Sequence, residues 1–327
     1  MASTGSPLLY VVFSILVLVL LAVDFVVLRA KGSHRVPMRE AALWSLVWVS
    51  AAAAFCAWFW WHLTGLHGRE VADEKALEFV TGYLIEKSLA VDNVFVWLSL
   101  FAYFAVPIEL QKRVLLYGVL GAIVMRGVLI FLGAILLAKF HWVLYLFGAF
   151  LVLSGAKLLW MAGKEEQSIE SNPMLRWLQG HIRMVHEYHG ERFFIVQRGV
   201  RYATPLFVVL LFVELTDLIF AVDSIPAIFA VTSDPFIVFT SNIFAILGLR
   251  AMYFMLQGLA DKFHYLKYGL AFILLFIGGK MLLLDVYKIP IGIALGVVAV
   301  ILVLAVAASW IWPKKKPGGS ATGHGSE

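Results

Sequence analysis

Long apolar stretches alternate with short polar connections along this chain. Each stretch has about 20 residues, the length that an α-helix needs to cross a hydrocarbon core of about 30 Å. Backbone groups inside lipid must be satisfied within their own segment, so each stretch is expected to be helical. The pattern predicts an all-α membrane protein with nine transmembrane helices, at residues 7–28, 41–63, 78–105, 115–138, 142–162, 204–231, 236–257, 268–285 and 289–312.

Lysine and arginine are divided unevenly between the two sets of connections. The segments after the first, third, fifth, seventh and ninth stretches hold 17 of them, and the other connections hold 4. Cytoplasmic loops carry this excess, so the N-terminus is expected outside and the C-terminus in the cytoplasm. The net charge of +5 follows from this topology and does not call for a nucleic-acid partner. A composition of 62% hydrophobic and 14% charged residues excludes an ordinary soluble domain.

An internal repeat is visible in the charged positions inside the stretches. The two series, in the same order, are Asp92, Arg126, Lys157 and Asp223, Arg250, Lys280. They define halves at about 78–162 and 204–285, each with three predicted helices. Because three is odd, the halves would lie in the membrane with opposite orientations, as in many secondary transporters. The substrate site of such a transporter lies between the halves.

The polar parts of the chain are few. Residues 1–313 are expected to form the transmembrane domain, and residues 163–203 its one sizeable cytoplasmic segment. Within that segment, 174–185 has helical amphipathic spacing suited to a membrane surface, and 193–202 fits a small hairpin or an extended link. The tail 314–327 is basic and then rich in Gly and Ser, which predicts disorder.

Acidic residues inside the apolar stretches carry the functional signal. A carboxylate at the centre of a membrane helix costs about 2.5–3.5 kcal/mol, so it usually lines a polar cavity. The tripeptide Ala-Val-Asp occurs three times, ending at Asp24, Asp92 and Asp223. Another acid lies six residues before the second and third copies. The full set of predicted site residues is Asp24, Glu86, Asp92, Asn93, Glu214, Asp217 and Asp223.

Two of these positions need comment. Asp217 and Asp223 lie about 240° apart on a regular helix of about 100° per residue, so they do not share a face. Pro226 removes a backbone hydrogen bond, and we hypothesise that it breaks the helix and turns Asp223 into the cavity of Asp217. Asp24 lies near the end of its stretch, close to Arg29, and its part in the site stays open.

Carboxylates and an amide are hard oxygen ligands, which suit Mn²⁺, Mg²⁺ or Ca²⁺ better than soft metals. The alternative is that the acids only neutralise buried bases; of these, Arg126, Lys157, Arg250 and Lys280 belong to the repeat. A proton-coupled carrier would use both arrangements. The sequence contains no phosphate loop, nucleophile triad or cofactor fingerprint, so we expect neither an enzyme nor a permanently bound cofactor.

Residues 82–96, 213–229 and 241–254 resemble motifs of the TerC family of bacterial integral membrane proteins, and in particular its Alx-like branch. The resemblance runs from about residue 7 to residue 313. The family is named for tellurium resistance, its Alx-like members are associated with manganese export, and it is grouped with exporters built from inverted three-helix repeats. The resemblance implies a multi-pass inner-membrane protein with an acidic site at Glu86, Asp92, Asn93, Glu214, Asp217 and Asp223.

Our interpretation is an Mn²⁺ exporter that works by alternating access and exchanges the ion for protons. Its partners would be the lipid bilayer, the divalent ion and protons, without a nucleic acid, and the sequence leaves protein partners open. Direct transport of tellurite is disfavoured because carboxylates repel an anion. The alternatives are a membrane scaffold or stress-response protein held together by buried ion pairs, and an anion or amino-acid exporter that uses Arg126 and Arg250.

Overall fold

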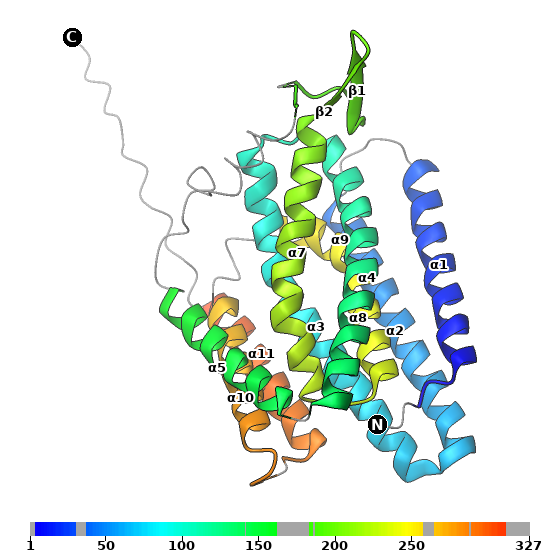
Figure 1. Cartoon of the computed structure of the whole chain (residues 1–327), viewed down its shortest axis with the longest axis vertical. Coiled ribbons are helices and arrows are strands. Elements are labelled where there is room, and N and C mark those ends of the chain that lie inside the picture. The colour runs from blue at the N-terminus through cyan, green and yellow to red at the C-terminus, as the bar shows by residue number, and fades with distance from the viewer. Residues whose placement is uncertain are drawn as a thin grey trace, which may run out of the picture.

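The described part of the chain is mainly helical. The computed structural model describes residues 4–30, 37–140, 142–161, 183–185, 187–257, 265–287 and 289–311, without the side chains of 27–30, Asp92 and Met161. Its helices are α1 (Pro7–Ala30), α2 (Met38–His67), α3 (Arg69–Tyr103), α4 (Ile108–Lys139), α5 (Val143–Met161), α7 (Pro205–Phe229), α8 (Pro235–Leu247), α9 (Leu249–Gln257), α10 (Leu266–Leu282) and α11 (Ile291–Ile311), as Figure 1 shows.

Seven helical segments of the described chain are long and apolar enough to cross a membrane. They are α1, α2, α4, α5, α7, the pair α8–α9 and α11. The helix α10 has only 17 residues, and α3 carries charged side chains along its 35 residues. The predicted all-α membrane class is therefore confirmed, whereas the count of nine spans stays a prediction.

A small hairpin precedes α7. Strand β1 (Phe194–Gln197) pairs antiparallel with β2 (Val200–Ala203). The two turn residues, Arg198 and Gly199, both have positive φ, which suits the tight turns of two-residue hairpins. The hairpin interpretation of 193–202 is thus confirmed, and the hairpin stands beyond the end of α7 (Figure 1). The tail 314–327 and most of the amphipathic stretch 174–185 lie outside the described residues.

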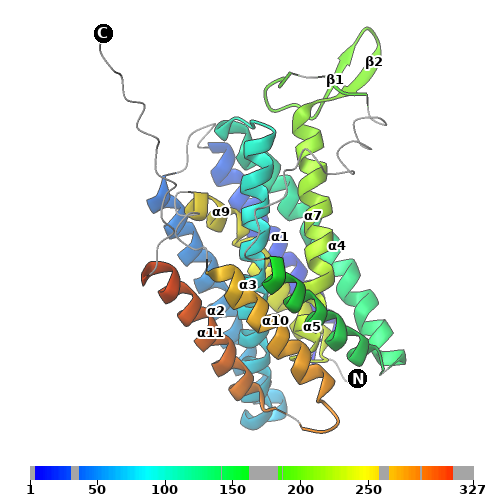
Figure 2. The same ribbon diagram turned by 90° about the vertical axis from the view of Figure 1, so that its left-hand side faces the viewer.

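The helices form two groups. In the larger group α3 packs against α2, α7 and α8, and α4 packs against α7. In the smaller group α5 packs closely along α10, which also contacts α11; Figure 2 shows these three helices side by side. Small residues allow the approach, since a Cβ added at Gly278 of α10 would lie 2.8 Å from the Gly148 carbonyl oxygen of α5.

Aromatic packing holds the N-terminal helices on the larger group. Phe13 of α1 lies between Phe55 of α2 and Phe244 of α8, with ring centroids 5.3 and 5.7 Å away. The start of α8 is capped by Asp234, whose Oδ1 accepts a hydrogen bond from the Phe236 amide at 3.0 Å. These contacts hold α1 and α2 against α8, which packs on α3 beside the buried charges described next.

Candidate functional site

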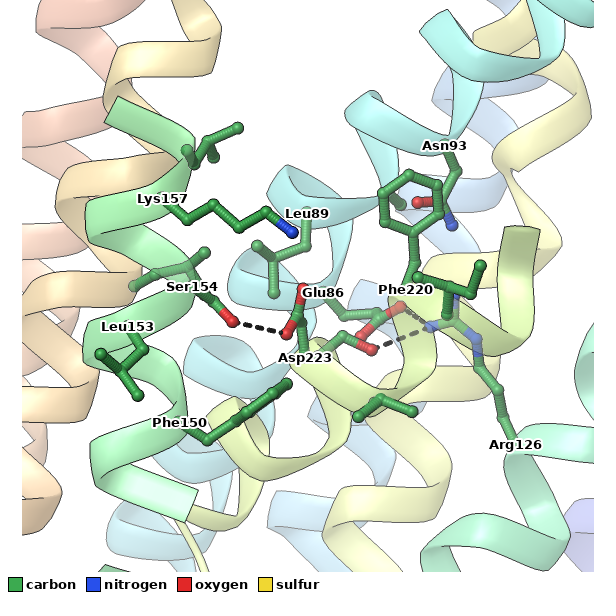
Figure 3. A pocket seen from close by; sticks show the side chains of 16 residues that line it. Glu86, Leu89, Asn93, Arg126, Phe150, Leu153, Ser154, Lys157, Phe220 and Asp223 are labelled. Atoms are coloured by element: carbon green, nitrogen blue, oxygen red, sulfur yellow. Dashed lines mark hydrogen bonds and ion pairs between the residues drawn. The ribbon is translucent and has the colours of Figure 1, made fainter. Parts of the chain in front are cut away.

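A fully buried arginine joins acids from two helices at the centre of the larger group. Arg126 of α4 has no exposed surface, and its Nη2 and Nε donate to the two carboxylate oxygens of Asp217 at 2.6 and 3.2 Å. Its Nη1 also forms an ion pair with Glu86 of α3 (Figure 3). The planar guanidinium suits this bidentate pairing. One cation is therefore shared by carboxylates from α3 and α7.

Neutral polar groups complete this cluster. Asn93 of α3 donates from Nδ2 to Asp217 Oδ1 at 3.1 Å, and Arg126 Nη1 donates to Ser224 Oγ at 3.4 Å. Ser224 follows Asp217 by seven residues, which is close to two full helical turns, so both side chains lie on one face of α7. That face is turned toward α3 and α4.

Asp223 reaches the same region from the neighbouring face of α7. It precedes Ser224 by one residue and therefore points about 100° away, toward α5. There Ser154 Oγ donates to Asp223 Oδ1 at 3.0 Å, and Lys157 interacts with the carboxylate electrostatically. The predicted break at Pro226 is wrong, because α7 runs uninterrupted from Pro205 to Phe229. Asp223 faces the cavity because α5 packs beside α7, so no break is needed.

A cavity of about 560 Å³ lies between these helices. Its lining comes from α3, α4, α5, α7 and α10 and includes Glu86, Asn93, Arg126, Lys157 and Asp223. Apolar side chains form most of the remaining wall, and Figure 3 shows α5 presenting Phe150, Leu153, Ser154 and Lys157 across from Glu86 and Asp223. The cavity is therefore a polar site in apolar surroundings.

Two buried oxygen atoms beside the cavity lack hydrogen-bond partners in the described part of the chain, Glu86 Oε2 and Asn93 Oδ1. Leaving a buried acceptor unsatisfied costs about 1–3 kcal/mol, so both oxygens favour a proton, a water molecule or a cation. Counted formally, the carboxylates of Glu86, Asp217 and Asp223 outnumber the cations of Arg126 and Lys157 by one. The cluster is thus suited to take up positive charge.

Other predicted residues lie elsewhere. Glu214 is half-buried on α7 with its carboxylate against Gly121 of α4, and it does not line the cavity. Asp24 forms an ion pair with Arg250 of α9. Lys280 interacts electrostatically with Glu78 of α3.

Asp92 belongs to α3, but its side chain lies outside the described part of the structure. Among the described residues no three His, Cys, Asp or Glu side chains are grouped so that they could hold a metal ion. The predicted acidic residues therefore do not form one ready-made ligand shell there. Arg126 stands between two of them.

Sequence reasoning missed Ser154. Its signal was its position three residues before Lys157, which places both on one face of α5. What the sequence did not reveal was that this face would meet Asp223.

The family follows from comparison with known proteins. Residues 71–317 match the profile described as the integral membrane protein TerC family. The chain belongs to the TerC family. It is 57% identical to a protein of Escherichia coli (strain K12) named Alx, over 95% of this chain and 97% of the relative. That protein's proposed role is that of a membrane-bound redox modulator.

More distant TerC relatives cover as much of the chain. An Alx protein of Photorhabdus laumondii is 54% identical over 96% of this chain and 98% of its own length. An uncharacterized membrane protein of Myxococcus xanthus is 46% identical over 96% of both chains. No solved structure matches this chain. Family, bacterial relatives and apolar helices together identify a multi-pass protein of the inner membrane.

Proposed function

We propose that this TerC protein exports a divalent cation, Mn²⁺, across the inner membrane by alternating access and in exchange for protons. In this proposal nine helices span the membrane, the N-terminus is outside, and the halves 78–162 and 204–285 form an inverted repeat. The ion enters the cavity between α3, α5 and α7, where Glu86 and Asp223 of the lining supply carboxylate ligands and Asn93 an amide oxygen. Asp217, which contacts Arg126 and Asn93 of the lining, supplies a third carboxylate.

The observation that carries the proposal is the buried cluster of Glu86, Asp217 and Arg126, in which Glu86 Oε2 and the neighbouring Asn93 Oδ1 have no hydrogen-bond partner among the described residues. Carboxylate and amide oxygens are the ligands that hard divalent ions prefer. In the state described here Arg126 occupies the position of a counter-ion between the acids. An uncompensated buried charge is costly, so the acids need Arg126, protons or a metal ion at every stage. Competition among these three would couple metal export to proton entry.

The inverted repeat is supported by how the helices pack. Aligning the two halves on their last lysine makes Gly155 correspond to Gly278, and Gly148 to Ala271. Gly155 lies against the Ala271 carbonyl, and Gly278 lies against the Gly148 carbonyl. Exchanging the halves turns one contact into the other. The packing of α3 on α8 and of α4 on α7 exchanges in the same way.

A second candidate is a membrane scaffold in which the ion pairs only hold helices together. The double pairing of Arg126 and the pair of Asp24 with Arg250 favour it. An anion exporter fits less well. Among the described residues that line the cavity the arginine is Arg126, and its charge is already compensated by two carboxylates. The chain has a single cysteine, Cys56, so a redox role like that proposed for the E. coli relative would not use an intrachain disulfide.

Metal flux in proteoliposomes tests the proposal. The purified protein is reconstituted with a trapped Mn²⁺-quenched dye, and Mn²⁺ entry is followed under an imposed pH gradient. We expect gradient-dependent flux for the wild type and at least a tenfold loss for Glu86→Gln and Asp217→Asn, because each removes a ligand and a proton carrier. Glu78→Gln is the matched control, since Glu78 is a buried acid of α3 outside the cavity lining.

Two results would contradict the exporter. One is a folded wild-type protein that moves no Mn²⁺, and the other is Glu86→Gln and Asp217→Asn variants that move it as fast as the wild type. A scaffold predicts instead that Glu86→Gln and Asp217→Asn fail to accumulate as folded protein.

A further inference from the structure

The two arginines that the repeat makes equivalent are used differently in this structure. Arg126 lies in the centre with Glu86 and Asp217. Arg250 is paired with Asp24 of α1, a helix outside both halves of the repeat. Its Nη1 has no hydrogen-bond partner in the described residues. Arg250 therefore has one ion-pair partner, Asp24, and a weaker electrostatic interaction with Glu40 of α2, whereas Arg126 has two ion-pair partners.

A difference in helix continuity accompanies this asymmetry. Arg126 lies within α4, which is continuous over 32 residues. The equivalent segment of the second half is interrupted at Gly248, two residues before Arg250, so that α8 ends and α9 begins. Lys87 packs against this interruption, with Nζ donating to the Ala245 carbonyl at 3.3 Å. The interruption thus lies beside the residue that follows Glu86 in the chain.

The two equivalent acids, unlike the two equivalent arginines, lie together at the centre. Glu86 and Asp217 each precede the aspartate of their Ala-Val-Asp copy by six residues, so each is the equivalent of the other. Exchanging the two halves leaves this acidic pair in place and replaces Arg126 by Arg250.

We propose that Arg126 and Arg250 alternate as the counter-ion of Glu86 and Asp217 in the two facing states. Asp24 is the positioning residue that pairs with Arg250 in the state in which Arg126 is the counter-ion. The proposal rests on the alternating access of the proposed function. The segment α8–α9 moves about Gly248 when Arg250 enters the centre. Arg126 then needs an acid of its own, and Glu214 lies one turn from Asp217 on the same face of α7, against α4.

The energetic reason is that neither state can leave the central acids Glu86 and Asp217, or a buried guanidinium, without a partner. Two carboxylates without a cation, or a guanidinium without an acid, are strongly disfavoured in a buried site. Asp24 stabilises the state seen here by pairing Arg250, and removing that carboxylate stabilises the opposite state relative to it. Removing Arg250 should have the reverse effect, because two carboxylates lose their counter-ion in the opposite state and only Asp24 loses one in the state seen here.

Sidedness of thiol labelling tests this inference without metal. The parent is Cys56→Ser with a reporter at the cavity, Leu158→Cys, in vesicles labelled by an impermeant thiol reagent from either face. The ratio of the two labelling rates reports the facing state. Minor states commonly hold about 0.1–10% of a population, so a shift to the majority changes the ratio by about tenfold or more.

Three variants give opposed expectations. Asp24→Asn should move labelling at least tenfold toward the face that is slow in the parent, Asp24→Glu should keep the parent ratio, and Asp24→Asn combined with Arg250→Ala should lose the shift. An unchanged ratio in Asp24→Asn, or a shift that survives in the combined variant, overturns the inference.

If Asp24→Asn does not accumulate, Arg250→Ala alone is the test. It should slow labelling about tenfold from the face that is already slow in the parent, and an unchanged rate overturns the inference. Failure of Mn²⁺ flux with the shift intact would refute the exporter but retain the alternation.

Discussion

Replacing Arg126 by alanine is expected to destabilise the protein strongly. The substitution removes two hydrogen bonds to Asp217, one to Ser224 and the ion pair with Glu86, all in a site with no exposed surface. Breaking a buried pair by removing one partner costs about 3–5 kcal/mol, because the remaining charge is left uncompensated. At about 2–4 °C per kcal/mol for domains of 150–250 residues, the unfolding temperature should fall by about 6–20 °C.

The assay is thermal unfolding in detergent, in which size-exclusion chromatography of the heated protein measures the fraction that stays folded. The informative comparison is the triple variant Arg126→Met, Glu86→Gln and Asp217→Asn. Replacing a complete buried ion cluster by neutral groups is often neutral or stabilising, so this variant should regain most of the lost stability. It should nevertheless move no Mn²⁺, because the charged ligands are gone. Stability and transport are thereby separated in one series.

An Arg126→Ala protein that unfolds at the wild-type temperature would refute the reasoning, since the carboxylates could not then depend on Arg126. A triple variant that still transports Mn²⁺ would equally remove Glu86 and Asp217 from the transport site.

Three other outcomes follow from local geometry. Gly278→Ala should destabilise the protein by about 1–3 kcal/mol in thermal unfolding, because the new methyl group meets the α5 backbone, whereas Gly279→Ala has open space and should be neutral or slightly stabilising. Equal effects at both glycines would contradict the close packing of α5 on α10. Asp234→Ala should cost about 0.5–2 kcal/mol in the same assay through loss of the α8 cap, and no change would mean that the cap is not used. Arg198→Cys, at the hairpin turn of a Cys56→Ser protein, should react with an impermeant thiol reagent only in inside-out vesicles. Reaction in right-side-out vesicles would show that the protein has the opposite orientation.

The helices could be predicted from the sequence because a lipid-embedded backbone has one efficient way to satisfy its hydrogen bonds. Each predicted apolar range overlaps a helix of the structure, with α8 and α9 together at 236–257. The helix break predicted at Pro226 does not occur, for a physical reason. A proline in a membrane helix is tolerated when neighbouring groups satisfy the freed backbone, and α7 is flanked by α3, α4 and α5.

The site was predictable as a set of residues but not as a set of pairs. Buried acids and bases in matched positions indicated an intramembrane polar centre, and Arg126 and Asp217 do meet there. Which acid meets which base depends on packing between helices that are distant in the sequence; Arg126 and Asp217 are 91 positions apart. The repeat also gave no reason to expect that Arg250 would differ from Arg126. That difference depends on Asp24 in α1, outside the repeat, and on the interruption at Gly248.

The most direct test of the central claim is to record Mn²⁺ entry and proton movement together in the same proteoliposomes. The account predicts that an imposed pH gradient drives Mn²⁺ across the membrane, that Mn²⁺ addition alone moves protons in the opposite direction, and that Glu86→Gln abolishes both signals while Glu78→Gln keeps them. Folded wild-type protein whose vesicles take up no more Mn²⁺ than protein-free vesicles would contradict it.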